Sequence, residues 1–310
     1  MAEGFSIGSV RMRNRLALAP MWGVSDLPFR LLCREQGAGL CFTEMINAEA
    51  VARNNKYAFR IAETCKEDRP LGLQLFGAKP ESMKEAALAL SKVVEFDFFD
   101  LNLGCPQPNI VKQGAGAALL KRPERVRELV TALKEAGKPV SAKIRLNPNV
   151  LNSISFCKML ESAGADCITV HAKTIKQGFG GKADFVALKR IARSVGVPVI
   201  ANGNIKTRLD VETTLEETKA AAAMIGQGAI GNPGVFAMVR GEKGMPVCDA
   251  MFGYLELCDK FGGLKFGHQK TQALRFLAAA KEKRLSQEAQ RAKDKPELLQ
   301  ILEKLMEKNQ

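Results

Sequence analysis

Short apolar runs alternate with amphipathic stretches along most of this chain. A short apolar run bounded by polar or glycine-rich turns predicts a buried strand, and apolar residues at three- and four-residue spacing predict a helix. We predict eight strands, at Leu16–Ala19, Leu40–Glu44, Leu71–Leu75, Phe98–Leu101, Val140–Ile144, Asp166–His171, Val197–Ala201 and Ala222–Ile225. We predict helices between them at Leu27–Gln36, Pro80–Glu95, Pro123–Ala136, Ser153–Ala163, Phe185–Val195 and Arg208–Lys219.

This alternation predicts an α/β fold, a (β/α)8 TIM barrel, within a catalytic domain of residues 1–240. Pro80 and Pro123 favour the helix assignments, because proline is well tolerated in the first turn of a helix. The alternative is an open doubly wound sheet. No G-x-G-x-x-G motif opens the first strand–helix unit, which weakens that alternative.

The pattern changes at Gly241–Pro246, after which no strand is predicted. We expect helices at Ala250–Phe261, Gln269–Lys283 and Pro296–Lys308, in a small C-terminal helical domain of residues 246–310. Residues 265–295 contain nine Lys or Arg against three acidic residues. Such a basic segment is either a solvated helical surface or a surface that binds nucleic acid.

Composition narrows the class of protein. The formal net charge of +13 favours a polyanionic partner, although a basic surface without any partner is the alternative. No apolar run reaches the length of a membrane span, and no signal peptide is recognised at the N-terminus, so we expect a cytoplasmic protein that does not bind membranes. Eight cysteines without a C-x-x-C pair, and only two histidines, argue against a metal site and against disulfides.

Polar side chains stand at the carboxyl ends of the predicted strands, where the active site of a (β/α)8 barrel lies. Seven of the eight strand ends have such a side chain, and the residues at the eight ends are Pro20, Met21, Trp22, Glu44, Gln74, Asn102, Cys105, Lys143, Arg145, His171, Lys173, Asn202, Gly203, Asn204, Gly226 and Gln227. The glycines after the seventh and eighth strands are typical of a phosphate site, because backbone N–H groups there can approach an anion. Many barrels bind phosphorylated substrates, so this feature alone does not identify one.

Lys143 lies on a predicted buried strand and therefore needs an anionic partner or a lowered pKa. A reduced flavin develops negative charge along N1–C2=O, which a lysine would stabilise, and Gln74 could bond the pyrimidine edge of the same ring. The alternative is a structural ion pair between Lys143 and Glu44. His171, taken alone, is more often a hydrogen-bonded core histidine than a ligand.

Cys105 follows the fourth strand in the segment Asn102-Leu103-Gly104-Cys105-Pro106. Most free cysteines are buried and behave as small apolar residues. A thiol in an irregular loop at a barrel mouth could instead be a nucleophile, which needs a neighbouring base, or a proton donor, which keeps its proton until it reacts. The residues alone do not choose between these two roles.

Several motifs, taken in order, resemble the tRNA-dihydrouridine synthases. The motifs are Ala19-Pro20-Met21-Trp22-Gly23-Val24-Ser25-Asp26-Leu27-Pro28-Phe29-Arg30, Asp100-Leu101-Asn102-Leu103-Gly104-Cys105-Pro106, Gly114-Ala115-Gly116-Ala117-Ala118-Leu119-Leu120, Lys143-Ile144-Arg145, His171-Ala172-Lys173-Thr174, Asn202-Gly203-Asn204 and Gly226-Gln227-Gly228-Ala229. Each motif is weak alone, and their combination over roughly residues 10–240 is specific.

The resemblance implies a TIM barrel that holds FMN and a C-terminal helical domain that binds tRNA. NADPH or NADH would reduce the flavin, a hydride would pass to C6 of a uracil, and Cys105 would protonate C5. The resemblance assigns cofactor contacts to Pro20, Met21, Trp22, Gln74, Lys143, His171, Asn202, Gly203, Asn204, Gly226 and Gln227. It assigns substrate contacts to Asn102, Arg145 and Lys173. A uracil within folded RNA must be flipped out to reach a flavin, which agrees with a broad basic surface.

Three positions depart from the family pattern. Asn109 stands where a lysine is usual, Lys173 where an arginine is usual, and Gln227 where an arginine is usual. Lys173 keeps the charge but loses the planar guanidinium. Gln227 removes a charge from the predicted phosphate end, so retention of FMN there would depend more on backbone groups.

Two other functions are compatible with parts of this pattern. A flavin enzyme for a free pyrimidine, of the dihydroorotate dehydrogenase type, would share the phosphate end but would not need the basic helices. A non-catalytic RNA-binding barrel would share the charge but would not need Cys105. Of the three functions, we expect tRNA uridine reduction, carried out by a monomer.

Overall fold

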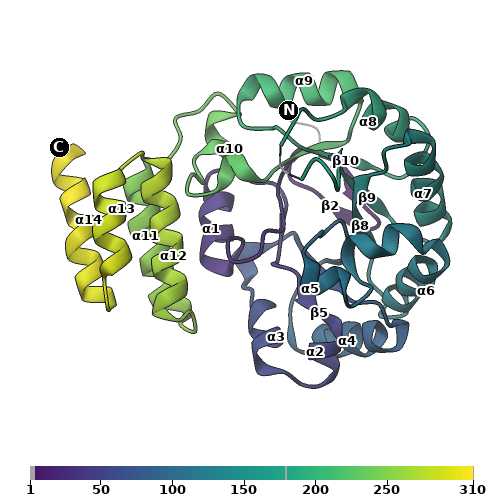
Figure 1. Ribbon diagram of the computed structural model, residues 1–310, viewed down its shortest axis with the longest axis horizontal. Helices are drawn as coiled ribbons and strands as arrows, with labels where there is room; N and C mark the ends of the chain where they lie inside the picture. The colour runs from purple at the N-terminus through teal and green to yellow at the C-terminus, as the bar shows by residue number, and fades with distance from the viewer. Residues whose placement is uncertain (1–3, 179, 310) are drawn as a thin grey trace.

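The computed structural model describes residues 4–178 and 180–309 and contains a closed barrel of parallel strands (Figure 1). The barrel strands are β3 (Leu16–Leu18), β4 (Cys41–Phe42), β6 (Leu71–Phe76), β7 (Phe98–Leu103), β8 (Val140–Leu146), β9 (Cys167–Thr174), β10 (Val199–Asn202) and β11 (Ala222–Ile225). The sheet runs in the order β3-β11-β10-β9-β8-β7-β6-β4. All eight strands that the apolar runs predict are therefore present, and the predicted (β/α)8 barrel is confirmed.

The barrel closes between its first two strands. Ala17 of β3 pairs in parallel with Leu40, just before β4. The N–H of Leu18 donates to the carbonyl of Leu40 over 2.9 Å. An open doubly wound sheet has two free edges, so this pairing excludes that alternative.

Aromatic rings fill the lower part of the barrel interior. The rings of Phe42 and Phe98 meet edge to face with centroids 5.7 Å apart. Gly72 lies between them, and a Cβ at this position would stand 2.6 Å from a ring carbon of Phe42. Ile7, from the hairpin of β1 (Ser6–Ile7) and β2 (Val10–Arg11), packs into the same cluster. These buried side chains fill this end of the barrel.

Helices surround the barrel and bury their apolar faces against the outer sides of the strands (Figure 1). The main ones are α1 (Leu27–Glu35), α4 (Pro80–Val93), α6 (Pro123–Lys134), α7 (Val150–Ser162), α8 (Phe185–Ala192) and α9 (Arg208–Thr218). Pro80 and Pro123 each open their helix, as predicted. Short elements that the sequence pattern did not predict are β5 (Ile46–Asn47), α2 (Ala48–Ala52), α3 (Lys56–Ile61), α5 (Pro108–Val111), α10 (Val235–Met238), and the 3-10 turns η1 (Lys66–Asp68), η2 (Gly116–Lys121) and η3 (Gln227–Ala229).

Four helices follow the barrel, and the first two of them stand beside α1 (Figure 1). They are α11 (Val247–Phe261), α12 (Phe266–Ala279), α13 (Lys283–Arg291) and α14 (Lys295–Asn309). The sequence predicts three of these helices, and the helix predicted for α12 extends to Lys283, beyond its observed end at Ala279. The chain turns earlier, where Lys281 takes a φ of 61°. Helix α13 was not predicted because it buries only Leu285 and Ala289.

The change of pattern at Gly241–Pro246 falls between the end of α10 and the start of α11. The predicted domain limits at residues 1 and 310 lie outside the described residues. Within the described part of the chain, no helix combines the length and apolarity needed to cross a membrane.

Candidate active site

A cavity of about 440 Å³ opens at the carboxyl ends of the barrel strands. This volume is within the range of sites for small molecules and cofactors. Every residue to which a site role was assigned from the sequence lines it: Pro20, Met21, Trp22, Gln74, Asn102, Cys105, Lys143, Arg145, His171, Lys173, Asn202, Gly203, Asn204, Gly226 and Gln227. The structure thus brings the predicted residues together around one space.

The cavity carries a strong positive charge. Four cationic side chains line it, namely Lys143, Arg145, Lys173 and Lys206. No Asp or Glu is found among the described residues of its lining. Lys206 was not singled out from the sequence, although it follows Asn204 closely after the seventh barrel strand. A cluster of cations in the lining of a cavity favours an anionic ligand.

Lys143 reaches into the cavity from β8 and donates to Oδ1 of Asn202 over 3.2 Å. Burial, together with the charge of Arg145, lowers the pKa of Lys143 to about 8. The alternative ion pair with Glu44 is wrong, because the Glu44 carboxylate instead accepts the N–H of Gly23 over 2.7 Å. Lys143 is therefore available to stabilise negative charge on a ligand.

His171 lies beside these cations on β9. Burial, followed by the charges of Lys143, Arg145 and Lys173, lowers the pKa of His171 to about 2. The imidazole is neutral at physiological pH, so it offers one N–H donor and one acceptor to a ligand.

A buried carboxylate that the sequence reasoning missed lies beneath the cavity. Asp100 of β7 accepts from Nε2 of Gln74 over 2.6 Å and from Oγ of Ser141. Burial raises the pKa of Asp100 to about 6. A signal was present, because Asp100 and Asn102 alternate with apolar residues and therefore share the inner face of one strand. Asp100 fixes the orientation of the Gln74 amide, whose Oε1 accepts from Asn102 over 2.8 Å.

The loop that carries Cys105 is held at both of its ends. Oδ1 of Asn102 accepts the N–H groups of Gly104 at 3.2 Å and Cys105 at 3.0 Å. The carbonyl of Cys105 accepts the N–H of Ala117 over 3.0 Å. Gly116 has a φ of 58°, and a Cβ there would lie 2.7 Å from that carbonyl. The half-buried thiol therefore has a defined place at the cavity wall.

Burial raises the pKa of the Cys105 thiol, while the N–H of Gln107 and the charges of Arg145 and Lys143 oppose this shift. The thiol consequently keeps its proton at neutral pH. This protonation state is the one that a proton donor needs, whereas a nucleophile reacts as the thiolate.

Arg145 and Lys173 complete the wall next to this loop. Arg145 donates from Nε to the carbonyl of Gly104 over 3.0 Å and from Nη1 to the carbonyl of Gly178 over 2.8 Å. Lys173 is almost fully buried, and burial together with the charges of Arg145 and Lys206 lowers its pKa. Asn109, on the short helix α5, does not line the cavity.

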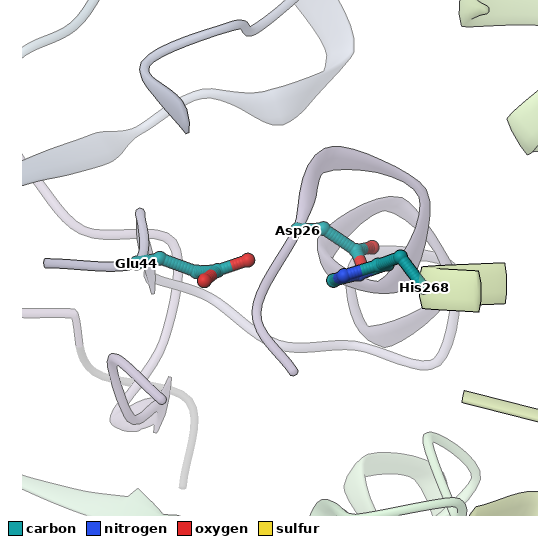
Figure 2. Close-up of side chains that lie close together, drawn as sticks. All are labelled: Asp26, Glu44 and His268. Carbon is teal, nitrogen blue, oxygen red and sulfur yellow. The ribbon is translucent and has the colours of Figure 1, made fainter. Parts of the chain in front are cut away.

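Three side chains of the metal-binding type gather outside the described cavity lining. Asp26, Glu44 and His268 present ligand atoms within 4.8 Å of one another, and Figure 2 shows Glu44 pointing towards Asp26 and His268. Both oxygens of Asp26 already accept hydrogen bonds: Oδ1 from the N–H of Phe29, and Oδ2 from Tyr254 and Gln272, with His268 at 2.7 Å. We therefore treat this group as a hydrogen-bonded contact rather than as a metal centre.

The comparisons with known proteins agree on one family. Residues 17–307 match the family described as dihydrouridine synthase. A relative from Aquifex aeolicus (strain VF5), named "Probable tRNA-dihydrouridine synthase", is 36% identical over 239 residues, which are 76% of this chain and 75% of that protein. The tRNA-dihydrouridine synthase B of Pasteurella multocida (strain Pm70) is 32% identical over 275 residues, covering 84% of this chain and 82% of that protein.

Among solved structures, an old yellow enzyme homologue from Zymomonas mobilis is similar with a TM-score of 0.56 at 12% identity, over 75% of this chain and 90% of that chain. At this identity the likeness supports the barrel fold alone.

Proposed function

Because the chain belongs to the dihydrouridine synthase family, we propose that it reduces uridine in tRNA to 5,6-dihydrouridine, with FMN as the bound cofactor and NADPH or NADH as the reductant. The observation that carries this proposal is the lining of the cavity. It contains Cys105 and four cationic side chains, and no Asp or Glu is found among its described residues. We further propose that residues 1–240 form the catalytic domain and residues 246–310 the tRNA-binding domain of a cytoplasmic monomer.

The residues of the cavity suit a flavin mononucleotide. Met21, Ala19, Met224 and Ile230 give an apolar wall for a flat ring, and the cations suit a phosphate. Gly203 takes a φ of 130°, a conformation favoured by glycine that leaves its backbone without a side chain beside His171. Lys206 lines the same cavity as Gln227 and lies close to Gly228, so it would offer a positive charge near the position where the family pattern has an arginine.

Each side chain then has a separate task. Bound FMN would supply the hydride that reaches C6 of the uracil and would accept electrons from NADPH or NADH. Lys143 and neutral His171 would hold the polar edge of the ring, Gln74 would donate to it, and Pro20, Met21 and Trp22 would contact its faces. Asn202, Gly203, Asn204, Gly226 and Gln227 would hold the ribityl phosphate.

Cys105 would deliver its Sγ proton to C5 of the uracil. Its raised pKa keeps that proton in place before the reaction. Asn102 and Arg145 hold the backbone of Gly104 and Cys105, so they would position the donor as well as the base. Lys173 would supply a charge near the uracil or its phosphate.

The experiment that tests the function begins with the purified full chain. We expect bound FMN, identified by its absorption and by mass after release. Incubation with an unmodified tRNA transcript and NADPH or NADH should add two hydrogens to specific uridines, detected by mass spectrometry of nuclease fragments. Reduction of free uracil or orotate in place of tRNA would support a free-pyrimidine enzyme. Tight tRNA binding without flavin would support a non-catalytic barrel.

A further inference from the structure

One residue next to the cavity wall, Gly23, is held by two different parts of the chain. Gly23 lies between Trp22 and Val24, which both line the cavity. Its N–H donates to Oε2 of Glu44, next to β4, over 2.7 Å. Its carbonyl accepts from Nη1 of Arg275 on α12. The loop at the cavity mouth thus joins the barrel to the C-terminal helices.

Arg275 belongs to a polar face of α12, which we call the α12 clasp and define as His268, Gln272 and Arg275. These residues are four and three positions apart, so they project from one side of the helix. Nε2 of Gln272 donates to the carbonyl of Val24 over 2.8 Å and to Oδ2 of Asp26 over 2.9 Å. His268 contacts the same carboxylate oxygen over 2.7 Å, and Figure 2 shows its ring beside Asp26.

The contacts of Gln272 are shielded from water, whereas those of His268 and Arg275 are partly buried. Gln272 is 1% exposed and Asp26 is 6% exposed. Removal of the Gln272 or Arg275 side chain would leave the carbonyl of Val24 or Gly23 without this donor, at a cost that favours rearrangement of the loop. The loop that holds Met21 and Trp22 is therefore the segment that would respond.

Docking of α12 itself does not depend on these polar contacts alone. The ring of Phe276 on α12 packs against Phe29 at 6.2 Å and against Tyr254 at 5.9 Å, between ring centroids. Phe276 is fully buried. This apolar packing should keep the helix in place when one clasp residue is replaced, so the effect on the loop can be measured separately.

We propose that Gln272 and Arg275 are positioning residues for the cavity: from the C-terminal helices they fix the Met21–Val24 segment, and through it they couple RNA bound on those helices to the ligand held in the cavity. The part that concerns RNA rests on the proposed function, and the part that concerns the loop does not. Coupling of this kind is reciprocal, so RNA would strengthen flavin binding by the same factor by which flavin strengthens RNA binding.

The chain contains its own reporter for this loop. Trp22 is the single tryptophan of the sequence, and its side chain is 54% exposed at the cavity mouth. Its emission and its quenching by acrylamide therefore report on the Met21–Val24 segment without any label.

The first measurement compares Arg275→Ala and Gln272→Ala with the wild-type chain in the absence of RNA. Loss of one buried hydrogen bond should weaken FMN binding by about five- to ten-fold and change acrylamide quenching of Trp22 by roughly two-fold. Arg275→Lys should recover part of both. The matched control is Arg127→Ala on α6 of the barrel, whose guanidinium donates to Ser162 outside the cavity lining and whose loss should leave Trp22 and FMN binding unchanged.

The second measurement determines the FMN dissociation constant with and without saturating tRNA transcript. In the wild-type chain and in Arg127→Ala, tRNA should tighten FMN binding by several-fold, and in Arg275→Ala this factor should fall towards one. Unchanged Trp22 quenching and unchanged FMN affinity in both clasp variants, with folding verified by circular dichroism, would overturn the proposal. If the chain proved to reduce no tRNA, the Trp22 measurement would still decide whether the clasp positions the loop.

Discussion

The side-chain oxygen of Asn102 accepts the backbone N–H of Cys105 over 3.0 Å, which fixes the thiol loop to the end of β7. Arg145 holds the same loop through the carbonyl of Gly104. Both residues were expected to contact the substrate, and the structure gives them an additional role in placing the thiol. The position of Cys105 is thus a property of two barrel strands rather than of a free loop.

Replacement of Cys105 by Ala should abolish most dihydrouridine formation while FMN stays bound. General acid catalysis contributes about 10²- to 10⁴-fold to a rate, and loss of the donor should remove that contribution. Single-turnover reduction of tRNA measures the effect, and absorption at the flavin bands measures cofactor retention. Cys65→Ala is the control, because Cys65 is also half-buried but lies outside the cavity lining. A Cys105→Ala rate within two-fold of wild type would contradict the assigned role.

Flavin affinity should depend on pH through Lys143. Burial lowers the pKa of Lys143 to about 8 in the ligand-free chain, and an anionic ligand beside it should raise that pKa. Ligand binding then requires proton uptake above pH 8, so FMN affinity should fall by up to about ten-fold per pH unit as pH rises beyond this value. Fluorescence titration between pH 6.5 and 9.5 tests this. In Lys143→Met, affinity should be lower throughout and its decline above pH 8 should disappear; persistence of the same decline would exclude Lys143 as its cause.

The contact between His268 and Asp26 should stabilise the chain in a pH-dependent way. The hydrogen bond to Asp26 raises the pKa of His268, and burial opposes this shift. The negative charges of Asp26 and Glu44 raise the pKa further, whereas the positive charge of Arg275 lowers it. A histidine whose pKa is raised by folding contributes stability that is full below its unfolded value of about 6.5 and is lost as pH rises through the folded pKa.

The thermal midpoint of His268→Gln should therefore lie further below that of the wild type at pH 6 than at pH 8.5. Differential scanning fluorimetry across this range measures the gap between the two chains, and Gln keeps a neutral hydrogen-bonding group at the site. A gap that stays constant with pH would mean that the contact involves neutral His268.

The barrel and most of the residues that line the cavity could be predicted from the sequence, and the reason is physical. In a parallel barrel every strand is buried on its outer side, so apolar runs mark all eight strands, and their carboxyl ends meet at one end by topology. Asp100 could have been predicted in the same way, because it shares the alternating inner positions of β7 with Asn102. Its importance became visible only when Gln74 and Ser141 were placed beside it.

The α12 clasp could not be predicted in this way. Arg275 and Gly23 are 252 positions apart in the chain, and Gln272 and Val24 are 248 apart. No local pattern relates such residues, since the contact depends on how the C-terminal helices dock against α1. Helix α13 was missed for a related reason, because its surface is almost entirely polar and its few buried residues form no extended apolar face.

The exposed basic residues of α13 and its flanking turns offer the sharpest test of where tRNA binds. Within residues 265–295, Lys265, Lys281, Lys283, Arg284, Arg291 and Lys293 are exposed, whereas Lys270 and Lys295 donate to backbone carbonyls of neighbouring helices. Deleting the C-terminal helices would uncover Phe29, which packs on Phe276, and so would confuse binding with folding. Point substitutions in the full chain avoid this.

Lys283→Gln combined with Arg291→Gln should lower the affinity for every tRNA transcript tested. The slope of log K against log salt concentration should become shallower by roughly one for each phosphate that is no longer neutralised. FMN binding in the absence of tRNA should not change, because neither residue lines the cavity. Filter binding at several salt concentrations gives the slope. Lys92→Gln combined with Lys121→Gln, on the barrel side, is the matched control for a loss of two charges, since both side chains lie outside the C-terminal helices and the cavity lining. Equal losses of affinity in the two double variants would indicate a general effect of net charge, and a loss confined to the α13 pair would place tRNA on the C-terminal helices.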